Sequence, residues 1–357
     1  MRTRSPQAFG QDRRRKGFSL MPLNCLLLRG TACALPVLLM LGGIAPAQTR
    51  ASDPGQTNAG QPPAMPAPLQ DPPTAEAPAI RIEGPASQGS LNLGRVPKGW
   101  QVTVDGVPAR VDDAGRFVFG IGRDAAAADL VARAPHGATL ERRVTVAARD
   151  WAIERIDGLP PPKVTPDPEL QDRLRHEREL ILNARAASDD GIIGFEIATK
   201  GFRLPVEGRI SGVFGSQRVL NGTPRSPHRG LDLAAPEGTP VLAPAGGRVV
   251  LVMPDLWYTG GTIMIDHGQG VTSIFAHLSE MLIAPGQLVK AGDAIGRVGM
   301  TGRATGPHLH WGVFWKEVAV DPAPLVPALQ GRIDPMKPRP EPKPQPSAAV
   351  KPQTDQG

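Results

Sequence analysis

Residues 261–276 read GTIMIDHGQGVTSIFA, and this stretch decides the fold of the C-terminal part of the chain. Two apolar runs, 261–266 and 271–276, are joined by a short turn that contains two glycines. Strands joined by so short a turn are antiparallel neighbours. Short β runs and Gly/Pro turns continue on both sides, and they predict an antiparallel β domain over residues 204–327. The other predicted strands are 208–212, 241–243, 247–252, 288–289, 294–298 and 308–314.

A second β region precedes this domain and covers residues 79–150. Residues 101–104 alternate in polarity and run into Asp105-Gly106, a strong hairpin signal. We predict a small β-sandwich or barrel, and because it holds no cluster of ionisable residues we interpret it as a binding or spacer module. The intervening segment, 151–203, predicts a linker with a helix over 168–187 that begins at Asp167-Pro168. The fold class is therefore mainly all-β, with two β regions and a linking helix.

The two ends of the chain predict export and disorder. Residues 1–47 resemble a signal peptide: a basic region, a short apolar run and Ala45-Pro46-Ala47 as cleavage site. We expect cleavage after Ala47 and a periplasmic protein; an uncleaved leader would instead anchor the chain in the inner membrane, the only membrane association we expect. The Pro-rich residues 48–78 and the Pro/Lys-rich residues 328–357 predict a disordered linker and tail.

Charge and cysteine content exclude two classes of function. The formal net charge is +6, but the leader alone contains seven basic residues and one acidic residue, so the rest of the chain is balanced. With a single tyrosine as well, the sequence does not predict nucleic-acid binding. Both cysteines, Cys25 and Cys33, lie in the leader, so the mature chain has no thiol for disulfide, metal or nucleophile chemistry.

Histidines and one carboxylate form two short motifs, His228-Arg229-Gly230-Leu231-Asp232 and Gly306-Pro307-His308-Leu309-His310, with His277 between them. Imidazoles with one carboxylate are a typical ligand set of a catalytic zinc site. In an extended strand the first and last residues of the first motif would lie about 13 Å apart, so binding one ion requires a bend, which Gly230 allows.

The histidines of the second motif are two residues apart and share one face of a strand. Either both bind the metal, or one binds it and the other lies beside the open coordination position. The spacing leaves these alternatives open.

These motifs resemble the lysostaphin/LytM family of zinc endopeptidases, which cut peptidoglycan. The resemblance covers about 120 residues, and residues 79–150 are similar to the N-terminal module of some exported Gram-negative members. It implies that His228, Asp232 and His310 bind one zinc ion and that His277 and His308 are the catalytic pair, without saying which is the base. Family members often have Tyr where this chain has Phe275. The other segments that carry the resemblance are 211–215, 234–241, 243–247, 290–293 and 296–299.

The remaining histidines of interest, His136, His176 and His267, are interpreted as structural or solvated residues, because a lone histidine is usually not a ligand.

The resemblance implies a zinc-dependent endopeptidase that cuts stems or cross-links of peptidoglycan. The exported architecture favours D-Ala–diaminopimelate bonds over glycine bridges. The main alternative is a non-catalytic regulator that activates other wall hydrolases; such relatives usually lack ligands or catalytic histidines, and none is missing here. A third is a structural wall-binding protein that uses residues 79–150 and the basic tail. A regulatory protein partner, and inhibition of the groove by residues 79–203, are left open.

Overall fold

The computed structural model describes residues 77–158, 167–186 and 193–330. The leader, most of the Pro-rich linker, both cysteines and nearly all of the tail therefore lie outside the described residues. All described residues belong to one compact unit. Within the described ranges, neither α-helix is long and apolar enough to cross a membrane.

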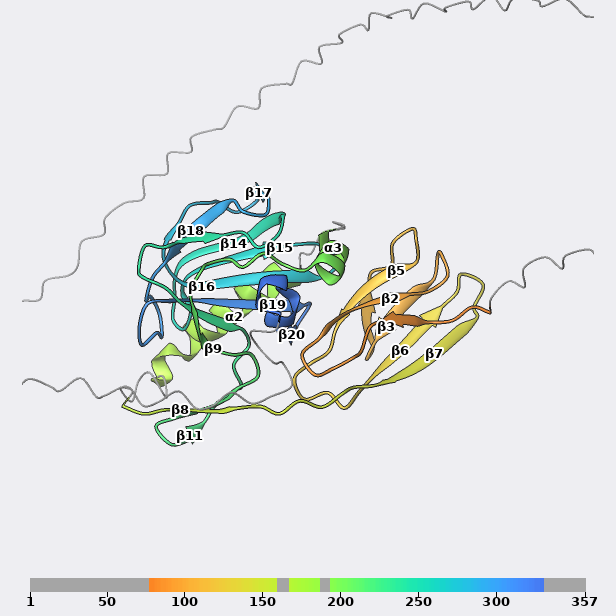
Figure 1. Cartoon of the computed structure of the whole chain (residues 1–357), viewed down its shortest axis with the longest axis horizontal. Helices are drawn as coiled ribbons and strands as arrows, with labels where there is room; N and C mark the ends of the chain where they lie inside the picture. The colour runs from red at the N-terminus through yellow and green to blue at the C-terminus, as the bar shows by residue number, and fades with distance from the viewer. Residues whose placement is uncertain (1–76, 159–166, 187–192, 331–357) are drawn as a thin grey trace, which may run out of the picture. The chain divides into compact units, whose positions relative to one another are not determined.

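The N-terminal β region consists of two separate sheets, so of the two predicted alternatives the sandwich fits and the barrel does not (Figure 1). The predicted hairpin turn is confirmed: Asp105 and Gly106 both have positive φ angles, 48° and 78°, which matches the type I′ turn. Phe117 and Phe119 are fully buried at the centre of the region. One sheet has the order β1-β2-β5 and the other β4-β3-β6-β7. Their bounds are β1 (Arg81–Glu83), β2 (Leu91–Arg95), β3 (Gln101–Val104), β4 (Val107–Ala109), β5 (Arg116–Gly120), β6 (Ala127–Arg133) and β7 (Thr139–Thr145).

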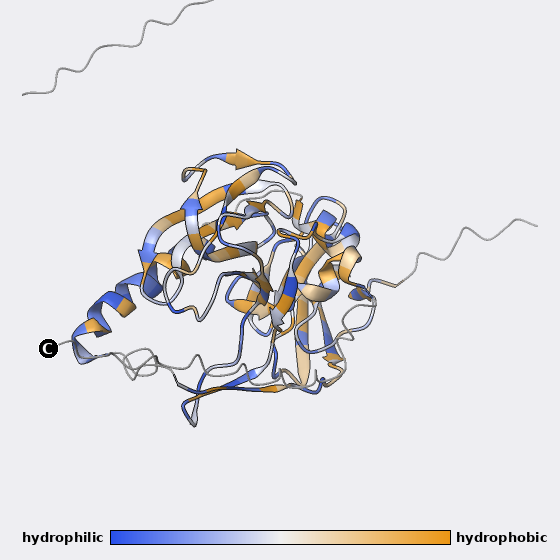
Figure 2. Ribbon diagram, turned by 60° about the vertical axis from the view of Figure 1, so that its left-hand side comes forward, coloured by the Kyte–Doolittle hydropathy of each residue, from blue (hydrophilic) through white to orange (hydrophobic). Residues whose placement is uncertain are grey.

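The C-terminal region is built on a ten-stranded sheet whose strand pairs are all antiparallel, as predicted. Its main order is β17-β14-β15-β16-β19-β12-β9. The stretch 261–276 forms the central hairpin of β15 and β16, and Figure 2 shows the strands of this sheet mostly as apolar ribbon. Its strands are β9 (Arg209–Gly212), β12 (Leu231–Ala234), β13 (Pro240–Leu242), β14 (Gly247–Leu256), β15 (Gly260–Asp266), β16 (Val271–Met281), β17 (Leu288–Val289), β18 (Ala294–Val298), β19 (His308–Trp315) and β20 (Val318–Val320).

A third, smaller sheet joins the linker to the C-terminal region. Its order is β11-β10-β8, with β8 (Ile153–Ile156), β10 (Gln217–Leu220) and β11 (Thr223–Pro224). The pairing of β8 with β10 is parallel, unlike every other strand pair in the described part of the chain. From the sequence, residues 151–156 are expected to belong to a linker, so this strand was not predicted.

The predicted linking helix is present as a 3-10 turn, Pro168–Leu170, followed by α2 (Gln171–Ala186). Its C-terminal end packs on the large sheet, where Ala184 joins an apolar cluster with Leu251 and Phe314. Figure 2 shows the rest of the helix as mostly hydrophilic, and His176 is exposed, as predicted.

A second helix, α3 (Ile193–Lys200), was not predicted from the sequence. It lies between the two β regions in Figure 1 and contacts β2 and β5. Phe195 and Ile197 of this helix are buried, and Arg116 of β5 stacks on the Phe195 ring. Two short 3-10 turns, Ala323–Leu325 and Pro327–Leu329, end the described chain.

Candidate metal centre and active site

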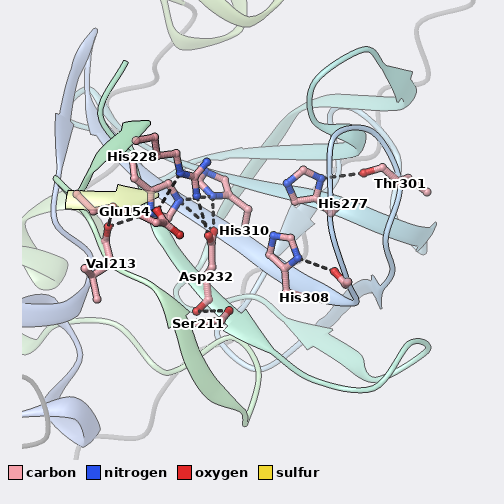
Figure 3. Close-up of polar contacts among 12 residues, drawn as sticks. Glu154, Ser211, Val213, His228, Asp232, His277, Thr301, His308 and His310 are labelled. Carbon is pink, nitrogen blue, oxygen red and sulfur yellow. Dashed lines mark hydrogen bonds and ion pairs between the residues drawn. The ribbon is translucent and has the colours of Figure 1, made fainter. Parts of the chain in front are cut away.

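Three predicted metal ligands converge at one point of the large sheet (Figure 3). The Nε2 atom of His228 lies 3.0 Å from Nδ1 of His310 and 3.0 Å from Oδ1 of Asp232. Nδ1 of His310 lies 2.7 Å from the same carboxylate oxygen. The side chains are largely buried, with exposed fractions of 1% for His228 and 9% for Asp232.

Strand register brings these residues together. Asp232 of β12 lies directly opposite His310 of β19, so their side chains are cross-strand neighbours. His228 precedes β12, and the chain bends at Gly230, as the sequence predicted. The glycine is needed for close approach, since a Cβ atom there would lie 2.6 Å from the carbonyl oxygen of Trp311 and 2.7 Å from the His310 ring.

The hydrogen bonds leave a metal-binding lone pair on His228. Its Nδ1 lies 2.9 Å from the carbonyl oxygen of Val213, so Nδ1 carries the proton and donates it.

Burial alone would raise the pKa of Asp232, but the facing rings of His228 and His310 hold it well below its ordinary value. Asp232 is therefore an anion.

This donor set fits a divalent cation such as zinc. Ligand atoms around a tetrahedral zinc ion at about 2.0–2.2 Å lie roughly 3.3–3.6 Å from one another. The three atoms lie at 2.7–3.0 Å from one another, about 0.3–0.6 Å below the lower end of that range, so small movements of the side chains would admit the ion. Two imidazoles and one carboxylate, with one imidazole oriented by a backbone carbonyl, are a common arrangement for such a site.

His277 and His308 form a second pair of rings beside this cluster. Their ring centroids are 4.7 Å apart, and the His277 ring is 6.1 Å from that of His310. Nδ1 of His277 donates to the carbonyl oxygen of Thr301 (2.8 Å), and Nδ1 of His308 donates to that of Gly306 (2.8 Å). When such a ring is uncharged, the free lone pair is on Nε2.

The electrostatics keep His277 uncharged. Burial, together with the nearby His310 and His308 rings, lowers the pKa of His277 to about 3. The ring is therefore neutral at neutral pH, and with Nδ1 donating to Thr301 its Nε2 lone pair is free.

The backbone of His277 is unusual for a strand residue. Its φ angle is 64°, in the left-handed region that non-glycine residues rarely adopt. The register between β15 and β16 shifts next to it, and β16 runs to Met281, beyond the predicted end at residue 276. Such a bulge re-aims a side chain, and strain of this kind is concentrated at functional sites.

All five predicted site residues except His228 line one cavity of about 340 Å³. Its wall also carries three arginines and a glutamate that the sequence analysis missed: Arg209, Arg218, Arg303 and Glu154. No motif marks these residues, and Glu154 reaches the cavity only because β8 pairs with β10.

The other singled-out residues lie apart from the site. His267 is buried, with Nδ1 donating to Gly246 (2.6 Å) and Nε2 accepting from the Ser273 hydroxyl (2.9 Å), so it is structural, as predicted. His136 is exposed. Phe275, which stands where relatives often have Tyr, is fully buried in the core.

Comparison with known proteins gives the family. The model of peptidase family M23 matches residues 226–322. The peptidoglycan DD-endopeptidase ShyA of Vibrio cholerae is 43% identical over 112 residues, 30% of this chain and 26% of that protein. The DD-carboxypeptidase/endopeptidase Mpg of Neisseria meningitidis is 49% identical over 84 residues, 24% of this chain and 19% of that protein. The chain thus matches less than a third of the length of either relative.

A solved structure matches more of the chain. A putative M23 peptidase from Pseudomonas aeruginosa is 30% identical with a TM-score of 0.52, covering 67% of this chain and 94% of that structure. The family match includes all five predicted site residues. The chain therefore belongs to peptidase family M23.

Proposed function

We propose that the protein is a zinc-dependent endopeptidase that hydrolyses peptide bonds in peptidoglycan. The observation that carries the proposal is the position of the His228–Asp232–His310 cluster beside a second pair of histidines, at one cavity. Relatives named as peptidoglycan endopeptidases support the substrate class.

In this proposal His228, Asp232 and His310 hold one zinc ion. When bound, zinc supplies a Lewis acid that polarises the scissile carbonyl and lowers the pKa of a bound water molecule. His277 and His308 then handle the protons. Each has its Nδ1 proton committed to a backbone carbonyl, so Nε2 can take a proton from the attacking water and pass it to the leaving amine. Either ring can stabilise the developing oxyanion only once its Nε2 carries a proton.

For the bond that is cut, we propose the D-Ala–diaminopimelate cross-link. The amide nitrogen of this bond is attached to a carbon that bears a free carboxylate. In a glycine bridge the corresponding carbon bears a carboxylate only when that glycine is the last residue of the peptide. Arg209 and Arg303 line the cavity. Burial and the charges of Arg218 and Arg225 lower the pKa of Arg303, so a bound carboxylate would relieve repulsion there.

We expect the protein to act in the periplasm, because residues 1–47 resemble a signal peptide. A wall substrate lies outside the cytoplasmic membrane, so export and the proposed substrate are consistent with each other.

The test is digestion of purified diaminopimelate-type sacculi by the chain that begins at Gln48, with zinc and with a chelator. We expect cross-linked dimers to decrease with zinc and to persist with chelator. His277→Ala is the inactive control, and His176→Ala, which changes an exposed histidine, is the matched active control. Intact dimers in the presence of stoichiometric zinc would contradict the proposal and favour a regulator of other hydrolases.

A further inference from the structure

Two ion pairs connect a residue of the linker to one of the proposed metal ligands. Nη2 of Arg218 donates to Oδ2 of Asp232 at 3.0 Å, and Nε of the same guanidinium donates to Oε2 of Glu154 at 3.2 Å. The hydroxyl of Ser216 also donates to this Glu154 oxygen, at 3.3 Å. The exposed side-chain fractions are 9% for Asp232, 24% for Arg218 and 18% for Glu154, so solvent screens these contacts only in part.

Glu154 belongs to a different part of the chain from the ligands. It lies in β8, just after the N-terminal β region, and β8 pairs in parallel with β10, which carries Arg218. Glu154 and Arg218 are direct partners in that register. Both residues lie outside the range that the family model matches, which begins at residue 226. Figure 3 shows Glu154 and His277 on opposite sides of the ligand cluster.

The two oxygens of Asp232 have different partners. Oδ1 faces His228 and His310, at 3.0 and 2.7 Å, whereas Oδ2 accepts from Arg218. Gly212 leaves the room that Oδ2 needs, since a Cβ atom there would lie 2.3 Å from it. A guanidinium held on Oδ2 fixes the carboxylate plane and leaves Oδ1 as the single oxygen directed at the cation.

Glu154 changes what Arg218 does to the charge of the site. An isolated guanidinium next to Asp232 would cancel much of the negative charge that attracts a cation. Because Glu154 pairs with the same guanidinium, the three groups together keep a net charge of −1, and Asp232 stays both oriented and anionic.

We propose that Arg218 is a positioning residue that holds Asp232 for one-oxygen binding of a divalent cation, and that Glu154 makes strand β8 a part of the metal site. This inference rests on the metal assignment in the proposed function. If the inference holds, the strand that follows the N-terminal β region contributes to the affinity of the site for the metal ion.

The test measures metal affinity in the full mature chain, by zinc competition with a chromophoric chelator, and the visible absorption of the cobalt-loaded protein. The variants are Arg218→Gln, Arg218→Lys and Glu154→Gln, with Arg297→Gln as the matched control because Arg297 forms an exposed ion pair with Glu280 away from the cluster. Thermal unfolding of each metal-free variant checks that it folds.

We expect Arg218→Gln to weaken zinc binding about 10- to 100-fold and to change the cobalt spectrum. Charge alone would predict tighter zinc binding, because the substitution removes a positive charge near the cation. Arg218→Lys keeps the charge but loses the planar fork that contacts both carboxylates, so it too should weaken binding. Glu154→Gln should weaken binding less, and this effect should vanish in the Arg218→Gln background.

Unchanged or tighter zinc binding in both Arg218 variants would overturn the inference while leaving the metal site intact. Asp232→Asn distinguishes failure of the metal assignment from failure of the positioning role. If Asp232→Asn binds zinc as the wild type does, the metal assignment itself fails; if it loses zinc and the Arg218 and Glu154 variants do not, only the positioning role fails.

Discussion

At the scale of single residues, three histidines of the site are oriented by the same kind of hydrogen bond. His228, His277 and His308 each donate their Nδ1 proton to a backbone carbonyl, at 2.9, 2.8 and 2.8 Å. This contact selects the tautomer and orients the ring, so Nε2 is the atom left for metal or proton chemistry. The tautomers of these side chains are therefore set by loop carbonyls, and of the three only that of Gly306 belongs to a histidine motif.

The first prediction separates ligand from catalyst. Asp232→Ala should lose both zinc and activity, because it removes the only carboxylate of the proposed donor set. His277→Ala should keep zinc and lose activity by roughly 100-fold or more, as expected for loss of a general acid–base group. Metal content by atomic emission and hydrolysis of muropeptide dimers check both. Equal zinc content in wild type and Asp232→Ala would contradict the ligand assignment.

The second prediction concerns acid stability and His267. Burial lowers the pKa of His267 to about 4, whereas in the unfolded chain it is about 6.5. Below pH 6.5 the unfolded state binds a proton that the folded state does not, so stability falls as the pH drops toward 4, by on the order of 3 kcal/mol. Urea unfolding at several pH values measures this slope.

The variant His267→Gln removes the titrating group and should flatten that slope, though with lower stability at neutral pH because two buried hydrogen bonds are altered. An identical pH slope in wild type and variant would show that other groups cause the acid effect.

The sequence predicts the five candidate site residues but not their neighbours. His228, Asp232, His277, His308 and His310 stand in motifs that resemble a known family. Arg218 and Glu154 stand in no motif, and their contact joins residues 64 positions apart. Only the pairing of two short strands brings them together.

At the scale of secondary-structure elements, the register of three strands, β12, β16 and β19, builds the site. Asp232 of β12 and Ala276 of β16 both pair with His310 of β19, so the residue after Ala276, His277, is next to the cluster. The bulge at His277 turns its ring to the cavity. Most strands of the large sheet could be predicted because Gly/Pro turns delimit them. The elements β8 and α3 could not: β8 has four residues, α3 has eight, and both depend on distant partners.

The third prediction tests the close approach at Gly230. Gly230→Ala would place a Cβ atom 2.6 Å from a backbone oxygen of β19 and 2.7 Å from the His310 ring. We expect a loss of about 1–3 kcal/mol in the free energy of unfolding, with weaker zinc binding. Gly122→Ala is the control, because its Cβ atom would meet only Val318 at 3.9 Å. If both variants bind zinc and unfold like the wild type, the packing argument is wrong.

At the scale of the whole described unit, the N-terminal β region is joined to the C-terminal region through buried contacts. Arg149 and Asp321 form an ion pair at 2.8 Å with exposed side-chain fractions of 6% and 4%. The Asp321 backbone N–H donates to the carbonyl of Gly89, and Trp151 packs edge-on against Phe214. The sequence suggested a spacer or binding module here. It could not predict the docking, since the ion pair joins residues 172 positions apart.

The fourth prediction follows from this interface. Asp321→Ala removes the buried carboxylate that lies 2.8 Å from Arg149 Nη2, and should cost about 3–5 kcal/mol of stability. Glu280→Ala, which breaks an exposed ion pair with Arg297, should cost about 0–1 kcal/mol. Urea unfolding should show one transition that shifts to lower concentration in Asp321→Ala. Two separate transitions, with only one of them shifted, would mean that the β regions unfold independently.

The most direct test of the central claim is cleavage of a purified D-Ala–diaminopimelate muropeptide dimer by protein that is first stripped of metal and then reloaded with zinc. The account predicts that stripped protein releases no monomer, that reloading restores cleavage, and that Asp232→Ala stays inactive with zinc present. Equal release of monomer by stripped protein and by Asp232→Ala would contradict metal-dependent hydrolysis at this site.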